Sequence, residues 1–416
     1  MEIKNFEIKE FLNVLNINKE NIKIRSKFLE DFYKKGFPTK KNEDWKFIDL
    51  NKSISSKIPN LKFFNKLINK EVGQINFVED IPIDLKNKNF VISKNGFIVE
   101  INFNQENQDE FEIIRTSDEV KVNPNDTLNL LNQALYLDYI KLTVKKSYIF
   151  KKPIVFVNLS SSNIESTNIN QRFDIVMEKN SSLSLLDLNL NQSINNFINV
   201  NNNFTLKEGS VLKNYKLDIS NNKNLYYSKT NIDLFKNSIA ENFVLSSGSE
   251  IAKNEIECNL KEDYSSAFVN GIIDINNIKQ HEIRSKINHL SENTKSYQLI
   301  KCALKDNAKA VYQGKIFVDS VAQKTDGYQL SKAILLNEGT EFNGKPELEI
   351  YADDVKCSHG SSSGNLDENK IFYLMTRGLN KNEAKKILLD GFFLEVIEKI
   401  TDEEIKNIIK DFSKIK

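Results

Sequence analysis

Short segments in which apolar and polar residues alternate dominate the middle of the chain. Alternation is typical of β-strands, because successive side chains on a strand face opposite sides of the sheet. The clearest alternating or β-rich segments are 182–190 (SLSLLDLNL), 203–206, 211–219, 266–275, 310–318 and 347–350. No long helical pattern interrupts the region from about Tyr148 to Ile350. The pattern therefore predicts a mainly β body built from many short strands.

Polar turns separate these strands, and several share one composition. An acidic or polar residue is followed by Gly and then by Ser or Thr, as in 208–210 (EGS), 247–249 (SGS) and 338–340 (EGT). A recurring corner of this kind favours a β-helix, in which each coil turns and stacks on its neighbour. The spacing of the corners is irregular, so a sandwich or a barrel stays open as an alternative.

The periodicity is helical in parts of the first third of the chain. Apolar residues recur at helical spacing in 18–35, which is followed by Gly36, and again in 126–137. Between these helices, the segment 89–103 (NFVISKNGFIVEINF) reads as two strands joined by an Asn95-Gly96 turn.

The pattern is helical again after His359. Three short helices are predicted at 367–377, at 381–400 and after Glu404. Asn380 and Glu383 have capping-box spacing, and Thr401 and Glu404 repeat it before the last helix. Three short helices are too few for a core of their own, so they must pack on the β body or on a partner. We therefore divide the chain into a mainly helical region 1–140, a β-helix core 141–362 and a C-terminal helical region 363–416.

The charge and the apolar content exclude several classes of protein. There are 58 basic and 57 acidic residues, a formal net charge of +1, which gives no field for steering onto nucleic acid or an anionic membrane. The N-terminal segment lacks the apolar run of a signal peptide, and no segment approaches the roughly 18 apolar residues of a membrane helix. We expect a soluble, cytoplasmic protein that binds neither nucleic acid nor membrane.

The motif content argues against a nucleotide-binding or hydrolytic enzyme. The sequence has no GxxxxGK[ST], no GxGxxG between a strand and a helix and no HExxH. Three cysteines, Cys258, Cys302 and Cys357, lie far apart without a CxxC pair, so neither a disulfide framework nor a self-contained metal site is indicated. We expect no nucleotide to be bound by this chain, so any ATP its process needs would bind another subunit.

The segment 351–360 (YADDVKCSHG) contains the most distinctive chemistry. Cys357 and His359 are two residues apart after a strand-like run, and residues i and i+2 of a strand face the same side, about 7 Å apart. A thiol and an imidazole on one face are suitable ligands for iron, copper or zinc. The alternative is a buried cysteine beside a hydrogen-bonded histidine. Two ligands do not complete a metal site, so the others would come from elsewhere in the fold or from another chain.

The other candidates have simpler interpretations. If 281–289 (HEIRSKINH) is a strand, His281 and His289 share its inner face, while Glu282, Arg284 and Lys286 face water. A structural role for both histidines is favoured over metal ligation. Asp353 and Asp354 could be paired acids, but consecutive strand residues point apart, so a turn or capping role is favoured.

Three segments together resemble one family. Residues 344–393 (beginning GKPELEIYADDVKCSHG), 311–329 (VYQGKIFVDSVAQKTDGYQ) and 36–50 (GFPTKKNEDWKFIDL) are similar to SufB/SufD iron–sulfur cluster assembly proteins, and lie in family order. Phe47 replaces the family's usual Tyr, and Ser361-Ser362 replaces Ala-Thr. The SufB branch lacks CSHG at the equivalent position, so the SufD branch fits better.

The resemblance implies a right-handed parallel β-helix between helical N- and C-terminal regions. It implies a non-catalytic scaffold that pairs with SufB through the β-helices, docks the SufC ATPase at its C-terminal helices, and shares a nascent Fe–S cluster with SufB. His359 would be the principal cluster ligand and Cys357 a supporting ligand or a structural thiol. The expected SufC-binding residues are Phe372, Tyr373, Arg377, Gly378, Leu388 and Phe392.

Two alternatives remain. One is a SufB-like scaffold that holds a cluster in a homodimer, since the isolated chain could itself form a homodimer. The other is a carbohydrate-active β-helix enzyme, which the solenoid pattern and Asp353/Asp354 permit. The single Trp and the absence of clustered acids on one strand face argue against that enzyme.

Overall fold

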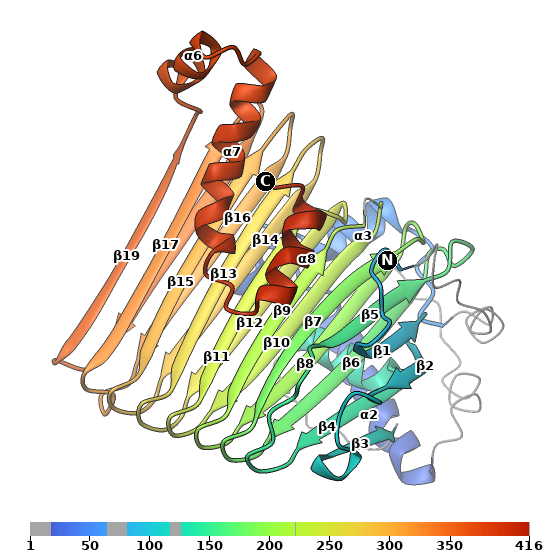
Figure 1. Cartoon of the computed structure of the whole chain (residues 1–416). Coiled ribbons are helices and arrows are strands. Elements are labelled where there is room, and N and C mark those ends of the chain that lie inside the picture. Colours follow the sequence, from blue (N-terminus) through green and yellow to red (C-terminus); the bar gives the residue numbers. More distant parts are fainter. Residues whose placement is uncertain (1–17, 65–80, 117–125, 221, 416) are drawn as a thin grey trace.

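Two long sheets form the body of the protein. The computed structural model describes residues 18–64, 81–116, 126–220 and 222–415 (Figure 1). Odd-numbered strands from β5 onward build one sheet and even-numbered strands from β4 onward build the other, so the chain passes from sheet to sheet at every corner. Neighbouring strands within each sheet are parallel over this region. This is the expected parallel β-helix with helices at both ends.

Several strands agree closely with the predicted alternating segments, whereas β8 and β18 begin well before the predicted 203–206 and 347–350. The ten-stranded sheet contains, in spatial order, β19 (Val355–Gly364), β17 (Thr325–Leu335), β15 (Lys295–Leu304), β13 (Ser266–Ile275), β11 (Ile239–Ser246), β9 (Val211–Asp218), β7 (Ser182–Asn191), β5 (Ile154–Ser160), β1 (Asn89–Lys94) and β2 (Phe97–Asn102). The nine-stranded sheet contains β18 (Glu341–Ile350), β16 (Lys309–Val318), β14 (Gln280–His289), β12 (Ile251–Leu260), β10 (Leu225–Leu234), β8 (Phe197–Leu206), β6 (Asn168–Met177), β4 (Tyr139–Val144) and β3 (Phe111–Thr116).

Left-handed backbone residues mark one corner of successive turns. The residues with positive φ at this corner are Asn180, Gly209, Asn237, Tyr264, Asn293 and Lys324. Their backbone N–H groups donate to carbonyl groups in the next corner, as Asn180 does to Glu208 at 2.9 Å and Asn293 to Gln323 at 2.9 Å. Asn and Gly adopt this conformation most readily, which explains why polar and glycine-containing corners recur in the sequence.

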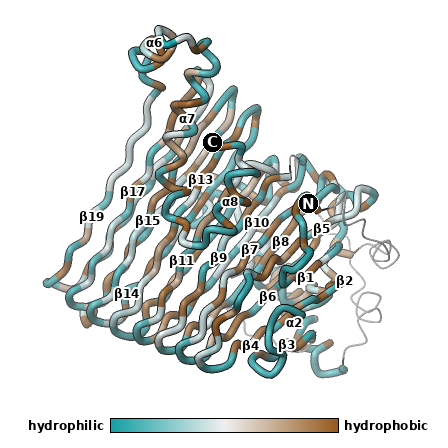
Figure 2. The backbone as a smooth tube through the Cα atoms, in the orientation of Figure 1, coloured by the Kyte–Doolittle hydropathy of each residue, from teal (hydrophilic) through white to brown (hydrophobic). Residues whose placement is uncertain are grey.

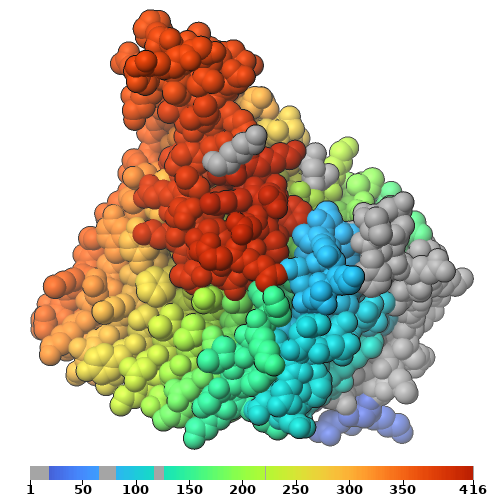
Figure 3. Space-filling model, viewed as in Figure 1, coloured from blue at the N-terminus to red at the C-terminus, as the bar shows by residue number. Residues whose placement is uncertain are grey.

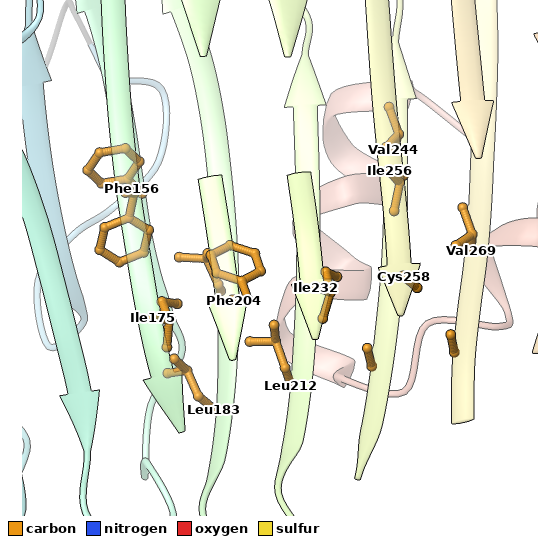
Figure 4. Close-up of a cluster of buried hydrophobic side chains, with 14 of the residues drawn as sticks. Phe156, Ile175, Leu183, Phe204, Leu212, Ile232, Val244, Ile256, Cys258 and Val269 are labelled. Carbon is orange, nitrogen blue, oxygen red and sulfur yellow. The ribbon is translucent and has the colours of Figure 1, made fainter. Parts of the chain in front are cut away.

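The space between the two sheets, here called the lumen, is the main core. Figure 4 shows a column in which Ile175, Phe204, Ile232 and Cys258 stack from strand to strand, in agreement with the register of β6, β8, β10 and β12. Each of these side chains is buried. Figure 2 shows how apolar positions alternate along the strands. Stacking of like residues at matching positions replaces the single compact core of a globular domain.

The lumen also contains a charged pair. Lys216 on β9 and Asp187 on β7 are register partners, with Nζ and Oδ2 3.1 Å apart. Their side chains are only 3% and 2% exposed. Asn158 on β5 donates to the other oxygen of Asp187 at 2.8 Å. Both charges are therefore held inside the protein and compensated there.

The N-terminal region covers the outer face of the nine-stranded sheet. It contributes α2 (Lys19–Lys35), η1 (Glu43–Trp45) and α3 (Leu50–Lys57), while η2 (Gln108–Glu110) and α5 (Thr127–Leu135) follow the β1–β2 hairpin. Lys253 Nζ donates to the carbonyl of Asp44 at 2.6 Å and lies 4.8 Å from the Trp45 ring centroid. Arg284 pairs with the Asp44 carboxylate at 2.5 Å.

This cover makes one sequence expectation wrong. Glu282 was expected to face water, yet it is completely buried. It pairs with Lys253 and accepts a hydrogen bond from Gln313 at 2.7 Å. Its outward direction on β14 was predicted correctly, but the N-terminal segment excludes solvent from that face.

The C-terminal helices are α6 (Glu368–Thr376), α7 (Lys381–Ile397) and α8 (Glu403–Ser413). Helices α7 and α8 lie against the outer face of the ten-stranded sheet, whereas α6 contacts α7 and lies beyond the sheet (Figures 1 and 3). Lys301 on β15 donates to the carbonyl of Phe392 and to Glu395 at 2.5 Å each. The capping box of Asn380 and Glu383 at the start of α7 is confirmed.

The second predicted capping box is wrong. The N-cap of α8 is Asp402, whose carboxylate accepts from Ile405 N at 3.1 Å. Thr401 instead donates its N–H and its hydroxyl to Glu241 on β11, at 3.0 and 2.6 Å. Spacing alone did not distinguish neighbouring capping residues, because Thr401 is used to attach the α7–α8 linker to the sheet.

The two ends of the β-helix differ. At the first end, β2 runs antiparallel to β1 and β3 runs antiparallel to β4, so the strand direction reverses in both sheets. At the other end, β18 and β19 are the outermost strands, and no described strand pairs with their free edges. That second end presents the backbone groups of two ten-residue strands.

Candidate functional site

The pair Cys357 and His359 lies on β19, at the free edge of the ten-stranded sheet. The strand-like run before it is a separate strand, β18, which ends at Ile350. Asp353 and Asp354 lie in the turn between the two strands and are exposed. Asp354 accepts a hydrogen bond from Lys324 N at 2.6 Å through its backbone carbonyl. The preferred turn role of these two acids is thus confirmed, and they do not form an acid/base dyad.

Cys357 is the inner member of the pair. Its half-buried side chain packs beside Ile316, Val318 and Leu348, a small apolar cluster at the end of the lumen. Its register partner on β17 is Gly327, where an added Cβ would come within 3.3 Å of the Cys357 sulfur. Burial raises the pKa of the Cys357 thiol, although a hydrogen bond from the Gly327 backbone acts in the opposite direction. In the isolated chain this cysteine is therefore protonated at neutral pH and is a weak nucleophile.

His359 shares the strand face of Cys357 but is exposed. Its register partner is Gln329 on β17, which is completely buried. The difference arises because β19 has a neighbour on one side only. The next pair along this face is Ser331 and Ser361, whose hydroxyl groups are 2.9 Å apart. Beyond Cys357 the groups on this face are polar, and His359 is the exposed imidazole among them.

This chain supplies an incomplete metal site. Among the described residues, no three His, Cys, Asp or Glu side chains lie close enough together to hold a metal ion. A tetrahedral iron or zinc site requires four donors. The thiol and imidazole of β19 could furnish at most two of them, and the free edge beside them is where further ligands could approach.

The remaining histidines have structural surroundings. His281 lies between the Ser246 hydroxyl, 2.8 Å from Nδ1, and the Ser249 carbonyl, 2.7 Å from Nε2. His289 contacts the hydroxyls of Thr294 and Ser296 at 2.7 and 2.9 Å. Burial lowers the pKa of each to about 4, so both are neutral at pH 7. Both point into the lumen with their ring nitrogens occupied by hydroxyls or a carbonyl, as the structural interpretation predicted.

The residues expected to contact SufC divide into two groups. Phe372 and Tyr373 on α6 are 69% and 57% exposed, and Arg377 at the end of that helix donates to the Tyr373 hydroxyl at 3.2 Å. Gly378 follows with φ of +95°, a conformation that favours glycine. Leu388 and Phe392 on α7 are only half-buried. The Nζ atom of Lys301 lies 4.4 Å from the centroid of the Phe392 ring.

Several residues around these positions escaped the sequence interpretation. Met375 and Ile387 extend the exposed apolar surface of α6 and α7, at 42% and 47% exposure. Gln329 and Gly327 lie directly beside His359 and Cys357. The repeat length could have identified Gly327 and Gln329. Register partners on β17 and β19 are 30 residues apart, as Ser331 and Ser361 are.

The fold and this edge define a parallel β-helix protein with a thiol and an imidazole at its open end. Residues 158–392, more than half of the chain, match the family described as SUF system FeS cluster assembly, SufBD core domain. The chain therefore belongs to the SufBD family of the SUF iron–sulfur cluster assembly system.

Individual relatives agree with this assignment. The chain is 24% identical over 391 residues to the iron–sulfur cluster assembly protein SufD of Escherichia coli (strain K12), covering 91% of this chain and 89% of that protein. It is 27% identical over 259 residues to SufD of Plasmodium falciparum, covering 60% of this chain and 17% of that protein. For SufD of Bacillus subtilis the identity is 30% over 122 residues, covering 29% and 28%. The chain is thus a SufD-type member of the family. Separately, none of the helices in the described part of the chain is long and apolar enough to cross a membrane.

Proposed function

We propose that this chain is a non-catalytic scaffold subunit that builds nascent Fe–S clusters together with a SufB-type partner. The observation that carries the proposal is the free edge of β18 and β19 beside Cys357 and His359. Unpaired strand edges are suited to pairing with another chain. A second β-helix that continues both sheets would cover His359 and bring its own ligands to the same place.

In this arrangement the two ligands have different roles. His359 is exposed and offers its imidazole to iron directly. Cys357 lies deeper, and its raised pKa means that it must lose a proton when it binds a metal ion. His359 is therefore the principal ligand of the proposal and Cys357 the supporting one. The cluster is cargo that is assembled and passed on.

The C-terminal helices supply a second partner surface. Phe372, Tyr373 and Met375 are exposed on α6, which Figure 1 shows at a distance from the sheets. Exposed aromatic groups beside an arginine are common in protein interfaces. We assign this surface to the SufC ATPase, because this chain has no nucleotide-binding motif and the assembly process would take its ATP from another subunit. No nucleic acid or membrane is part of the proposal, and the location is the cytoplasm.

The role of His359 is tested by reconstituting the complex and measuring cluster formation by absorbance and Mössbauer spectroscopy. His359→Ala should abolish most of the cluster, whereas Ser363→Ala, an exposed change on the same strand, should leave it intact. Cys357→Ser should have an intermediate effect. Normal cluster yield with His359→Ala would remove the imidazole from the proposed site.

The docking surface is tested by co-purification with the ATPase. The double change Phe372→Ala and Tyr373→Ala should release the ATPase and leave the SufB-type partner bound. Ile149→Ala is the matched control, because Ile149 is 65% exposed but precedes β5, far along the β-helix from α6. Retention of the ATPase by the double variant would refute this assignment.

A second copy of this chain could occupy the same free edge, which is why a SufB-like homodimeric scaffold remains the alternative. Size-exclusion chromatography with light scattering separates the two cases. A stable homodimer that gains cluster absorbance on anaerobic addition of iron and sulfide would favour the homodimer. A heterodimer that alone holds the cluster would favour the main proposal.

A further inference from the structure

A pocket of about 570 Å³ lies between the ten-stranded sheet and the α7–α8 linker, away from β19. Strands β9, β11, β13 and β15 form its floor, and the linker forms one side. Its volume is typical of small-molecule sites in proteins.

The walls of this pocket are mainly apolar and aromatic. Phe268 and Tyr297 are half-buried, and Tyr297 stacks on Tyr328 with ring centroids 5.3 Å apart. Ile239 lies on β11, which flanks β13 on the side away from β15, and it is 37% exposed. The stacking on Tyr328 fixes the plane of Tyr297. A flat ring can therefore enter between preformed surfaces with little loss of side-chain freedom.

One buried polar group in the lining has no partner. Asn270 is 4% exposed, and its Oδ1 is buried without a hydrogen-bond partner among the described residues. The neighbouring buried acid is different, since Glu241 accepts from Tyr215 at 2.8 Å and from Thr401 at 2.6 Å. Buried polar atoms in native proteins are nearly always hydrogen-bonded. The unpaired amide oxygen is therefore an acceptor that a donor on a ligand could satisfy.

The charged side chains that line the pocket are Lys213, Lys399 and Glu241, whose formal charges sum to +1 and so favour an anion. Lys399 Nζ lies 5.5 Å from the Tyr297 ring centroid, and Lys213 lies on the β9 side. Neither lysine forms an ion pair within the described part of the chain. In the pocket beside η1, by contrast, Arg284 pairs with Asp44 and Lys286 with Glu257. The cations of the present pocket therefore remain available to a ligand.

We propose that this pocket binds a planar aromatic anion that also carries an N–H donor. The ring lies against Phe268 and Tyr297, the N–H donates to Asn270 Oδ1, and the anionic group faces Lys399. The site is separate from the Cys357–His359 edge, so the inference does not depend on the proposed assembly role.

Two matched probes test this chemistry. Indole-2-carboxylate has a ring, a carboxylate and an N–H, whereas benzofuran-2-carboxylate has an oxygen in place of the N–H. Calorimetric titration of the full chain should give one saturable site for the indole and about tenfold weaker binding of the benzofuran, the effect of about one hydrogen bond. Absence of saturable binding of the indole at millimolar concentration would overturn the proposal.

Three substitutions locate the binding site. Lys399→Ala, a change of an exposed residue that should not disturb folding, is expected to weaken both probes. Asn270→Leu should remove the preference for the indole over the benzofuran. Ile149→Ala, at an exposed position before β5 and far from this pocket, is the control and should leave probe binding unchanged. Binding that is unaltered by Lys399→Ala and Asn270→Leu, or that is lost with Ile149→Ala, would place the probes elsewhere and refute the inference.

Discussion

The ion pair in the lumen leads to a prediction whose size can be worked out. Lys216→Met keeps the apolar length of the side chain but leaves the Asp187 carboxylate without its cation. At 3.1 Å and an effective dielectric constant of about 20, the lost attraction is about 5 kcal/mol. Removal of one partner of a buried pair costs roughly 3–5 kcal/mol in proteins. We therefore expect Lys216→Met to lower the free energy of unfolding by roughly 3–5 kcal/mol.

The double variant Asp187→Leu/Lys216→Met separates the pair from its desolvation. With both charges absent, the cost should fall to about 1–2 kcal/mol, which reflects the lost hydrogen bond from Asn158 and imperfect packing. Lys213→Met is the matched control, because Lys213 is on the same strand but faces outward and is half-exposed. It should change stability by no more than about 0.5 kcal/mol.

The assay combines urea unfolding, followed by circular dichroism, with amide hydrogen exchange. Because a coil of a solenoid contacts mainly its neighbours, the loss should appear first as faster exchange in β7 and β9, while β15 stays protected. The reasoning would be refuted if Lys216→Met unfolded at the same urea concentration as the unmodified chain. It would also fail if the double variant were less stable than Lys216→Met alone.

Three further predictions concern other positions. Burial lowers the pKa of His281 and His289 from 6.5 to about 4. The stabilisation from the two neutral histidines should therefore be complete above pH 6.5 and be lost as the pH falls toward 4, by on the order of 3 kcal/mol per histidine. Urea titrations at several pH values should show a shallower decline for His281→Gln. Tyr264→Asn should raise the urea midpoint by an amount equivalent to up to about 1 kcal/mol, because Tyr264 is exposed and has φ of +63°, which asparagine tolerates better; a lower midpoint would contradict this. Gly271→Val should cost about 1–3 kcal/mol, since even a Cβ at this position would lie 2.8 Å from Ile283 and 2.9 Å from Ile300; an unchanged melting temperature would show that the lumen has spare room there.

Local sequence patterns accounted for much of the fold. Alternation located β7 and β13 nearly to the residue, and the Asn95-Gly96 turn was found between β1 and β2. Each of these features depends on neighbours in the sequence. The corner residues were recognisable for the same reason, since Gly209 and Gly339 adopt positive φ values that favour glycine.

Long-range contacts were beyond the reach of such patterns. Lys253 contacts the carbonyl of Asp44 across 209 residues, so the burial of Glu282 could not be inferred from the alternation of β14. Thr401 was wrongly assigned to a helix cap, because the residue that it contacts, Glu241, is 160 residues away in the sequence and local spacing could not reveal it. At the candidate site, spacing correctly placed Cys357 and His359 on one strand. It could not show that this strand is the last, which is what leaves the imidazole exposed.

The reversal of strand direction at the first end of the β-helix limits how far an assembly can grow. The outermost strands there, β2 and β3, are six residues long and antiparallel to their neighbours, whereas β18 and β19 are ten residues long. The two edges do not match, so one copy cannot add its first end to the last end of another. Among the described strands, β18 and β19 carry the only long free edges, and molecules that join through them consume both. Association by this route stops at two subunits, and a protein made almost entirely of stackable coils is kept from forming fibres.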